Sequence, residues 1–227
     1  ERGEIEVKVI PKDATRANVM IANKSGKPLQ IQLPEAFAAV PVLAQFGGGG
    51  MGGGGMGGGG MGGGGGGGGQ AMGGGMGGGG MGGGGMGGGG MGGGGRGGGG
   101  GMFNVAPDAV GKVKANCVCL EHGKKDPNPR IAYTMKPIES VTTNPRVIEV
   151  CKMVGRGDLT QEVGQATAWH YTDGLSWQEL ANKIKIKHLN GSVEFFFTRQ
   201  QVVVASQIAA AMEQQIPDDD SAYPSSG

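Results

Sequence analysis

The sequence lacks an excess of charge of either sign, and it lacks any long apolar run. Its 227 residues carry 20 Lys and Arg against 19 Asp and Glu, and the two signs are well mixed. A nucleic-acid-binding protein shows a basic patch, so we expect no nucleic-acid partner. The longest apolar stretches, 36–46 and 202–212, are too short to cross a bilayer as a helix, so we expect no membrane span.

Cysteine is scarce, with residues only at positions 117, 119 and 151. An odd number allows one disulfide and one free thiol. Cys117 and Cys119 lie two positions apart in a strand-like stretch and point the same way, which disfavours a bond between them. We predict a disulfide between Cys119 and Cys151. Three buried thiols are the alternative, because a free cysteine packs as a small hydrophobic residue.

The chain begins with Glu1 in place of Met. This start indicates a leader peptide that has been removed, although an artificial starting point is the alternative. We therefore expect a protein that is secreted, extracellular or on the cell surface.

Two parts of the chain show the alternation of apolar and polar residues that is typical of β-strands. In residues 1–46 the alternation runs through Ile5, Val7 and Val9, and it returns in two more short stretches before Pro34. In residues 102–143 it returns between Val113 and Cys119. Short, evenly spaced strands predict a small antiparallel β-sandwich whose two parts are 1–46 and 102–143.

Residues 144–216 predict a small helical region that includes one β-hairpin. Asn144 and Pro145 form a helix start, and Gly155 marks the expected end of that helix. Asp158 is expected to cap a second helix. The stretches 176–179 and 198–201 fit capping boxes of two further helices, with an Asn190-Gly191 hairpin turn between them. The tail, 217–227, is expected to be disordered or to dock on a partner.

Glycine is concentrated in one stretch, residues 47–101, which holds 44 of the 54 glycines. This stretch has a hidden five-residue period. A flexible linker has no need of a period and normally uses Ser in place of Met, so the period predicts an ordered or assembling segment. A disordered spacer is the alternative. The methionines in phase lie at Met51, Met56, Met61, Met76, Met81, Met86 and Met91.

Polyglycine can form extended three-fold rods that resemble polyproline II. A single rod has no internal hydrogen bonds, so it needs neighbours to satisfy its backbone. We expect the stretch to leave the sandwich and return, with a turn near Gln70, and its methionines to pack between rods of several copies. Phe46 and Phe103 would anchor its two ends. The expected partner is thus the protein itself, as a homo-oligomer.

Residue patterns for catalysis are weak. Cys117, Cys119, His122 and Cys151 include metal-ligand types, but one residue between paired cysteines is fewer than zinc sites use. A cysteine near His122 lacks a recognisable third group. The glycine run is not followed by the Gly-Lys-Ser/Thr of a phosphate loop. We therefore expect no enzyme activity, no cofactor and no metal, and no small-molecule ligand is identifiable.

Two stretches carry a resemblance to a known group of proteins. One runs from Val7-Lys8-Val9-Ile10-Pro11 to the segment 33–45, and the other joins Val118-Cys119-Leu120-Glu121-His122-Gly123-Lys124 to the segments 165–170 and 175–181. Together they resemble uncharacterised exported proteins of planctomycete-type bacteria with a glycine-rich insert. The resemblance implies export and a split domain, and it brings no activity or catalytic residue.

From these patterns we expect a secreted structural protein that assembles through its glycine-rich stretch into an extracellular filament or matrix. The alternative is a monomeric, envelope-associated binding module in which the stretch is a flexible spacer. Its ligand site would then lie near Trp169, His170 and Trp177.

Overall fold

The structure is a computed structural model that describes residues 3–42, 69–76 and 101–216. Its strands are β1 (Ile5–Pro11), β2 (Arg16–Asn23), β3 (Leu29–Gln32), β4 (Phe37–Pro41), β5 (Met72–Gly75), β6 (Met102–Val105), β7 (Val110–Cys119), β8 (Tyr133–Lys136), β9 (Ile184–Lys187) and β10 (Val193–Phe195). Its helices are the 3₁₀ turn η2 (Ile138–Ser140) and the α-helices α1 (Pro145–Arg156), α2 (Gln161–Asp173), α3 (Trp177–Asn182) and α4 (Arg199–Gln215).

Six strands close into one antiparallel barrel in the order β1-β2-β7-β5-β4-β8. Pairing of Val9 with Tyr133 joins β1 to β8 and completes the ring. The chain is α+β, as expected, but its strands form a closed barrel in place of the two packed sheets of a sandwich. The reason is β5. This strand joins β7 to β4, which would otherwise both be open sheet edges.

Side-chain alternation fills the barrel, as the sequence predicts. Val9 of β1 and Ala17, Val19 and Ile21 of β2 point inward and are at most 3% exposed, while the residues between them face outward. From the other side Phe37 of β4 completes this interior, at 1% exposure. The barrel therefore has a packed core of its own.

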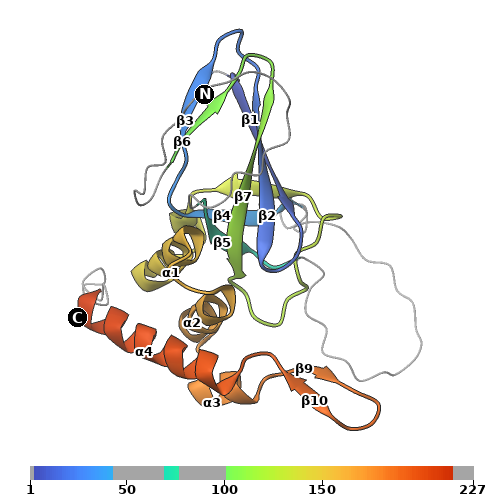
Figure 1. Ribbon diagram of the computed structural model, residues 1–227, viewed down its shortest axis with the longest axis vertical. Helices are drawn as coiled ribbons and strands as arrows, with labels where there is room; N and C mark the ends of the chain where they lie inside the picture. Colours follow the sequence, from blue (N-terminus) through green and yellow to red (C-terminus); the bar gives the residue numbers. More distant parts are fainter. Residues whose placement is uncertain (1–2, 43–68, 77–100, 217–227) are drawn as a thin grey trace, which may run out of the picture.

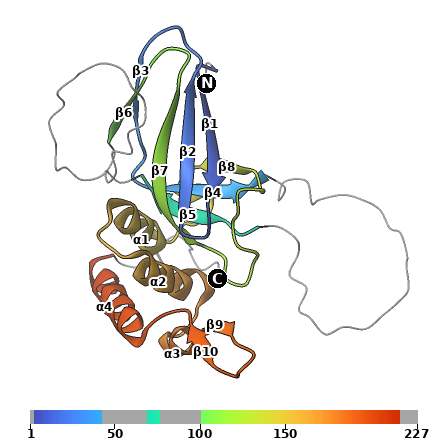
Figure 2. The same cartoon turned by 45° about the vertical axis from the view of Figure 1, so that its right-hand side comes forward.

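Two small antiparallel ribbons extend from this body. β3 pairs with β6 beside the far ends of β1, β2 and β7, and β9 pairs with β10 beyond the helices (Figures 1 and 2). The second ribbon is the hairpin predicted from Asn190 and Gly191, and Gly191 has a positive φ of 85°. Its apolar residues Ile184, Ile186 and Phe195 are each at least 43% exposed.

The helices begin and end largely at the predicted signals. Asn144 caps α1 by accepting a hydrogen bond from the Arg146 amide, and both predicted capping boxes are present. Two boundaries differ. Helix α1 continues through Gly155 to Arg156, because the left-handed residue that ends it is Gly157, with φ 82°. Helix α2 begins after Thr160, because Asp158 pairs with Arg156.

Helices α1 and α2 pack on one side of the barrel, next to β5 and β7, and α4 packs on the outer side of α2 (Figure 2). The contact is a second apolar core. From the barrel it takes Ala38 and Val118, and from the helices it takes Val147, Val150 and Trp169. Strand β5 thus has the barrel interior on one face and helix α1 on the other.

Candidate functional site

The centre of the glycine-rich stretch is a strand of the barrel. Residues Met72–Gly75 pair with β7 from Cys119 to Asn116, and Met72, Gly73 and Gly74 pair with β4. The sequence predicts a turn in this region, so this placement corrects that expectation. The stretch 47–101 is therefore divided by β5, and we call residues 43–68 the first arm and residues 77–100 the second arm.

Glycine is required in β5 by close approach of neighbouring groups. A Cβ atom on Gly73 would lie 2.4 Å from Cys151 Sγ in α1. At Gly75 it would lie 2.6 Å from the Glu35 carbonyl oxygen and 2.7 Å from Gly155 Cα. Real Cβ atoms do not approach other atoms so closely, so α1 can lie this near to β5 only because the strand has no side chains there.

Hydrogen bonds hold the chain just before β5. The Tyr133 hydroxyl donates to the Gln70 carbonyl oxygen at 2.9 Å, and Gln70 Nε2 donates to Asp126 Oδ1 at 2.8 Å. The Ala71 amide donates to Glu121 Oε2, also at 2.8 Å. Burial raises the pKa of Tyr133 to about 12, so its hydroxyl keeps the proton that it donates. Gln70 itself is only 2% exposed.

Of the nine predicted assembly residues, two lie within the described residues and seven lie outside them. Met76 is 3% exposed and belongs to the barrel core, so it is not available to pack between copies. Phe103 lies on β6 and packs on Gly111 of β7, where a Cβ atom would lie 2.3 Å from its ring. The others lie outside the described residues: Phe46, Met51, Met56, Met61, Met81, Met86 and Met91.

All three cysteines are buried free thiols, so the structure does not contain the predicted disulfide between Cys119 and Cys151. Cys119 pairs with Met72 on β5, and its Sγ donates to the Ala14 carbonyl oxygen at 3.6 Å. Cys151 lies on α1, with its Sγ against Gly73. The two thiols therefore have different partners, although both belong to the core between the barrel and the helices. Burial raises the pKa of Cys119 and of Cys151 to about 12, so neither is a ready nucleophile.

The residues proposed for a ligand site are engaged in packing. His170 stacks on Trp177 with ring centroids 4.1 Å apart, and its Nδ1 donates to the Leu175 carbonyl oxygen at 2.8 Å. Trp169 is 5% exposed and packs on Phe196 and Phe197. The structure thus uses these rings to join α2, α3 and α4.

A polar pair lies at the edge of this aromatic cluster. Lys183 Nζ lies 2.6 Å from His122 Nε2 and 5.2 Å from the centre of the Trp169 ring. Burial, and then the charge of Lys183, lower the pKa of His122, and burial lowers the pKa of Lys183. The geometry fits a neutral His122 that accepts a hydrogen bond from the ammonium group. Cys119, His122 and His170 therefore have separate partners and do not share a site.

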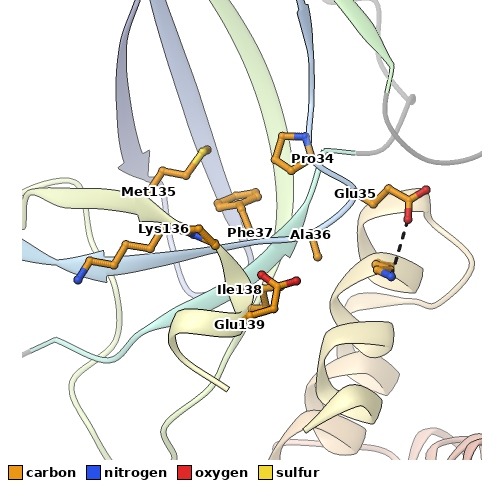
Figure 3. Close-up of a pocket in the computed structure, with 10 residues that line it drawn as sticks. Pro34, Glu35, Ala36, Phe37, Met135, Lys136, Ile138 and Glu139 are labelled. Carbon is orange, nitrogen blue, oxygen red and sulfur yellow. Dashed lines mark ion pairs between the residues drawn. The ribbon is translucent and has the colours of Figure 1, made fainter. Parts of the chain in front are cut away.

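One groove opens at the junction of β4, β8 and α1 (Figure 3). Its volume is about 510 Å³, and its apolar lining includes Pro34, Ala36, Pro137 and Ile138. An ion pair between Glu35 and Lys152, 3.8 Å apart, lies at one side. Nothing in the sequence pattern points to this groove, because its lining comes from loop and strand ends that are distant in the chain.

Among residues 3–42, 69–76 and 101–216, no group of three or more His, Cys, Asp or Glu side chains is placed to hold a metal ion. None of the helices there has the length and apolar character that crossing a bilayer requires.

Four residues that fix β5 in place were not predicted from the sequence: Gln70, Glu121, Asp126 and Tyr133. A signal for one of them exists, since Gln70-Ala71-Met72 is the only break in the glycine run that is not a single residue. The other three are scattered over a stretch read as loop and strand. Comparisons with protein-family models, with curated proteins and with solved structures found no match.

Proposed function

We propose that this protein is a structural protein that associates with copies of itself through its two glycine-rich arms, and that the association builds an extracellular filament or matrix. The observation that carries the proposal is the position of β5. It divides the glycine-rich stretch into two arms, and the described residues at both ends of each arm belong to one body.

The attachment points argue against a spacer. The first arm follows Val42, whose amide donates to Ala132, and ends at Gly69, which bridges to Lys125. The second arm follows Met76 and ends at Gly101, whose carbonyl accepts from Leu33. A spacer joins two bodies, but both arms begin and end on the same barrel. Neither arm therefore joins this barrel to a second body, which favours a role of their own.

The composition of the arms favours association. The sequence of the two arms contains six methionines, and each lies in a five-residue period of glycine. Methionine is apolar and adaptable, so it can fill gaps between glycine rods. Ordering a backbone costs about 1–2 kcal/mol per residue, and more for glycine, so rods need neighbours that share their hydrogen bonds. Copies of the same chain supply such neighbours.

The experiment replaces the six arm methionines with serine and leaves Met72 and Met76 in the core. We expect electron microscopy to show filaments or a network for the unchanged chain and dispersed particles for the variant, with equal melting temperatures. A matched variant carries leucine at the same six positions and should still assemble, because it keeps the apolar side chains. Equal assembly of the serine variant would refute the packing role, and dispersed particles of the unchanged chain would refute assembly.

The groove favours one other candidate, a monomeric binding module. Its volume of about 510 Å³ lies within the range of about 300–1,000 Å³ that is typical of small-molecule pockets. Dispersed particles of the unchanged chain would direct the search for a ligand to this groove and not to Trp169, which is buried.

A further inference from the structure

The groove beside β4 lies next to both ends of the second arm. Gly75, two residues before the arm, touches the Glu35 carbonyl oxygen so closely that a Cβ atom on it would lie 2.6 Å away. Gly101, directly after the arm, accepts a hydrogen bond from the Leu33 amide at 3.3 Å. Leu33 and Glu35 flank Pro34, which lines the groove. The arm therefore leaves the barrel and returns to it at one edge of this groove.

The groove offers an apolar surface for which the described residues provide no cover. Ala36, directly before β4, points toward α1, while the Phe37 ring turns to the barrel interior (Figure 3). Ile138 also lines the groove, but only 2% of it is exposed. Pro34 and Pro137 line it as well, and both are exposed. The charged groups around it are balanced, with Glu35 and Glu139 against Lys136 and Lys152. An uncharged apolar side chain fits such a surface best.

The second arm carries three such side chains within reach. Met81 is five residues from Met76, and Met91 is ten residues from Gly101. An extended chain spans about 3.3–3.6 Å per residue, so even the shorter of these distances allows roughly 17 Å. Methionine is unbranched and adaptable, which suits a shallow, irregular groove.

We propose that the groove is a docking site for a methionine side chain of the second arm of the same chain. The same chain is favoured over a second copy by proximity. An occupant tethered at the edge of its site has an effective concentration in the millimolar range, far above the concentration of free copies in a dilute solution. The docking does not depend on assembly, so it can be measured on dispersed protein.

Methionine oxidation by dilute hydrogen peroxide, followed by mass spectrometry of each position, tests this docking. Met51, Met56 and Met61 of the first arm are the internal reference, because they have the same glycine neighbours. Burying part of a methionine side chain gains more free energy than ordering the side chain costs. We therefore expect at least one of Met81, Met86 and Met91 to oxidise about fivefold more slowly than the reference. Ala36→Glu places a charge in the groove and should abolish the difference. Ala106→Glu, an equal change at an exposed position away from the groove, should preserve it.

Three results would contradict this docking. Equal oxidation of all six arm methionines in the unchanged chain overturns docking. Protection that survives Ala36→Glu overturns the groove as the site. Protection that increases with protein concentration overturns the same-chain occupant and assigns the groove to a second copy. Circular dichroism confirms that the variants are folded, and Pro137→Glu, at an exposed lining position, replaces Ala36→Glu if that variant does not fold.

Discussion

Gly155 is the residue at which helix α1 comes closest to β5. A Cβ atom at this position would lie 2.3 Å from Gly75 Cα, which is backbone and cannot rotate away. Gly155 also lies inside a helix, where glycine is about 1 kcal/mol less favourable than alanine. Helix propensity and packing therefore predict opposite effects for one substitution.

Gly155→Ala tests this contact. Propensity alone predicts a gain of about 1 kcal/mol, whereas overpacking against β5 predicts a loss of about 1–3 kcal/mol in the free energy of unfolding. We expect the loss to prevail, because backbone lies on both sides of the contact. Urea unfolding measures it. Gly26→Ala is the control, since a Cβ there meets nothing within 4 Å. A more stable Gly155→Ala protein would show that β5 does not lie under α1.

The cysteines show what residue patterns can and cannot predict. Alternation placed Cys117 and Cys119 on the same side of a strand, and their pairing with Gly74 and Met72 agrees. The proposed partner, Cys151, is on a helix, and alternation says nothing about which face of the sheet that helix covers. The answer depends on β5, because Cys119 pairs with Met72 of this strand, whereas Cys151 lies against Gly73.

Among the elements, those with local chemical signals were predictable. The capping boxes of α3 and α4 and the Asn190-Gly191 hairpin follow from residues that interact over three or four positions. Strand β5 has no such signal, because three of its four residues are glycine and carry no alternating side chains. Glycine normally weakens a strand, so nothing local favours β5. Strand β5 is stabilised by the strands it pairs with, by helix α1 and by the hydrogen bonds near Gln70. All of these contacts come from distant parts of the chain.

Tyr133 anchors the chain next to β5, so removing its hydroxyl should destabilise this strand. Tyr133→Phe removes the hydroxyl that donates to Gln70 and leaves a buried carbonyl group without that donor. We expect a loss of about 1–3 kcal/mol in the free energy of unfolding, and faster amide hydrogen exchange in residues 71–76.

Tyr171→Phe is the matched control for this anchor. It also removes a hydroxyl that donates to a backbone carbonyl, that of Ala209 at 3.1 Å, but it lies between α2 and α4. It should leave exchange in residues 71–76 unchanged. Equal exchange of β5 in Tyr133→Phe and in the unchanged chain would contradict an anchoring role.

At the scale of the whole molecule, closure of the barrel depends on β5, a strand that lies within the glycine-rich stretch. Among the other five strands, β1, β2 and β7 show alternating apolar residues in the sequence. Such alternation predicts a sheet but not its closure. Closure needs the register between β7, β5 and β4, and no local pattern contains this register. The sandwich inferred from the sequence therefore lacks β5 and β8, and the barrel forms because these two strands join the others.

Two deletions separate the arms from β5. Removing residues 47–101 takes away the strand between β4 and β7, and we expect a chain that does not fold cooperatively. Shortening each arm to about half while keeping residues 69–76 should leave the melting temperature nearly unchanged, because halving a loop changes its closure cost by only about 0.6 kcal/mol. Differential scanning calorimetry compares the two variants. Cooperative unfolding of the 47–101 deletion at the original temperature would show that β5 is dispensable.

The fixed position of β5 also bears on how this gene can change. Inserting or deleting a whole five-residue unit on either side of Gln70–Met76 changes the length of one arm only. Neither kind of event shifts the pairing of β5 with its neighbours. The lengths of the two arms can therefore change independently of each other, while the eight residues from Gly69 to Met76 must keep their register with β7 and β4.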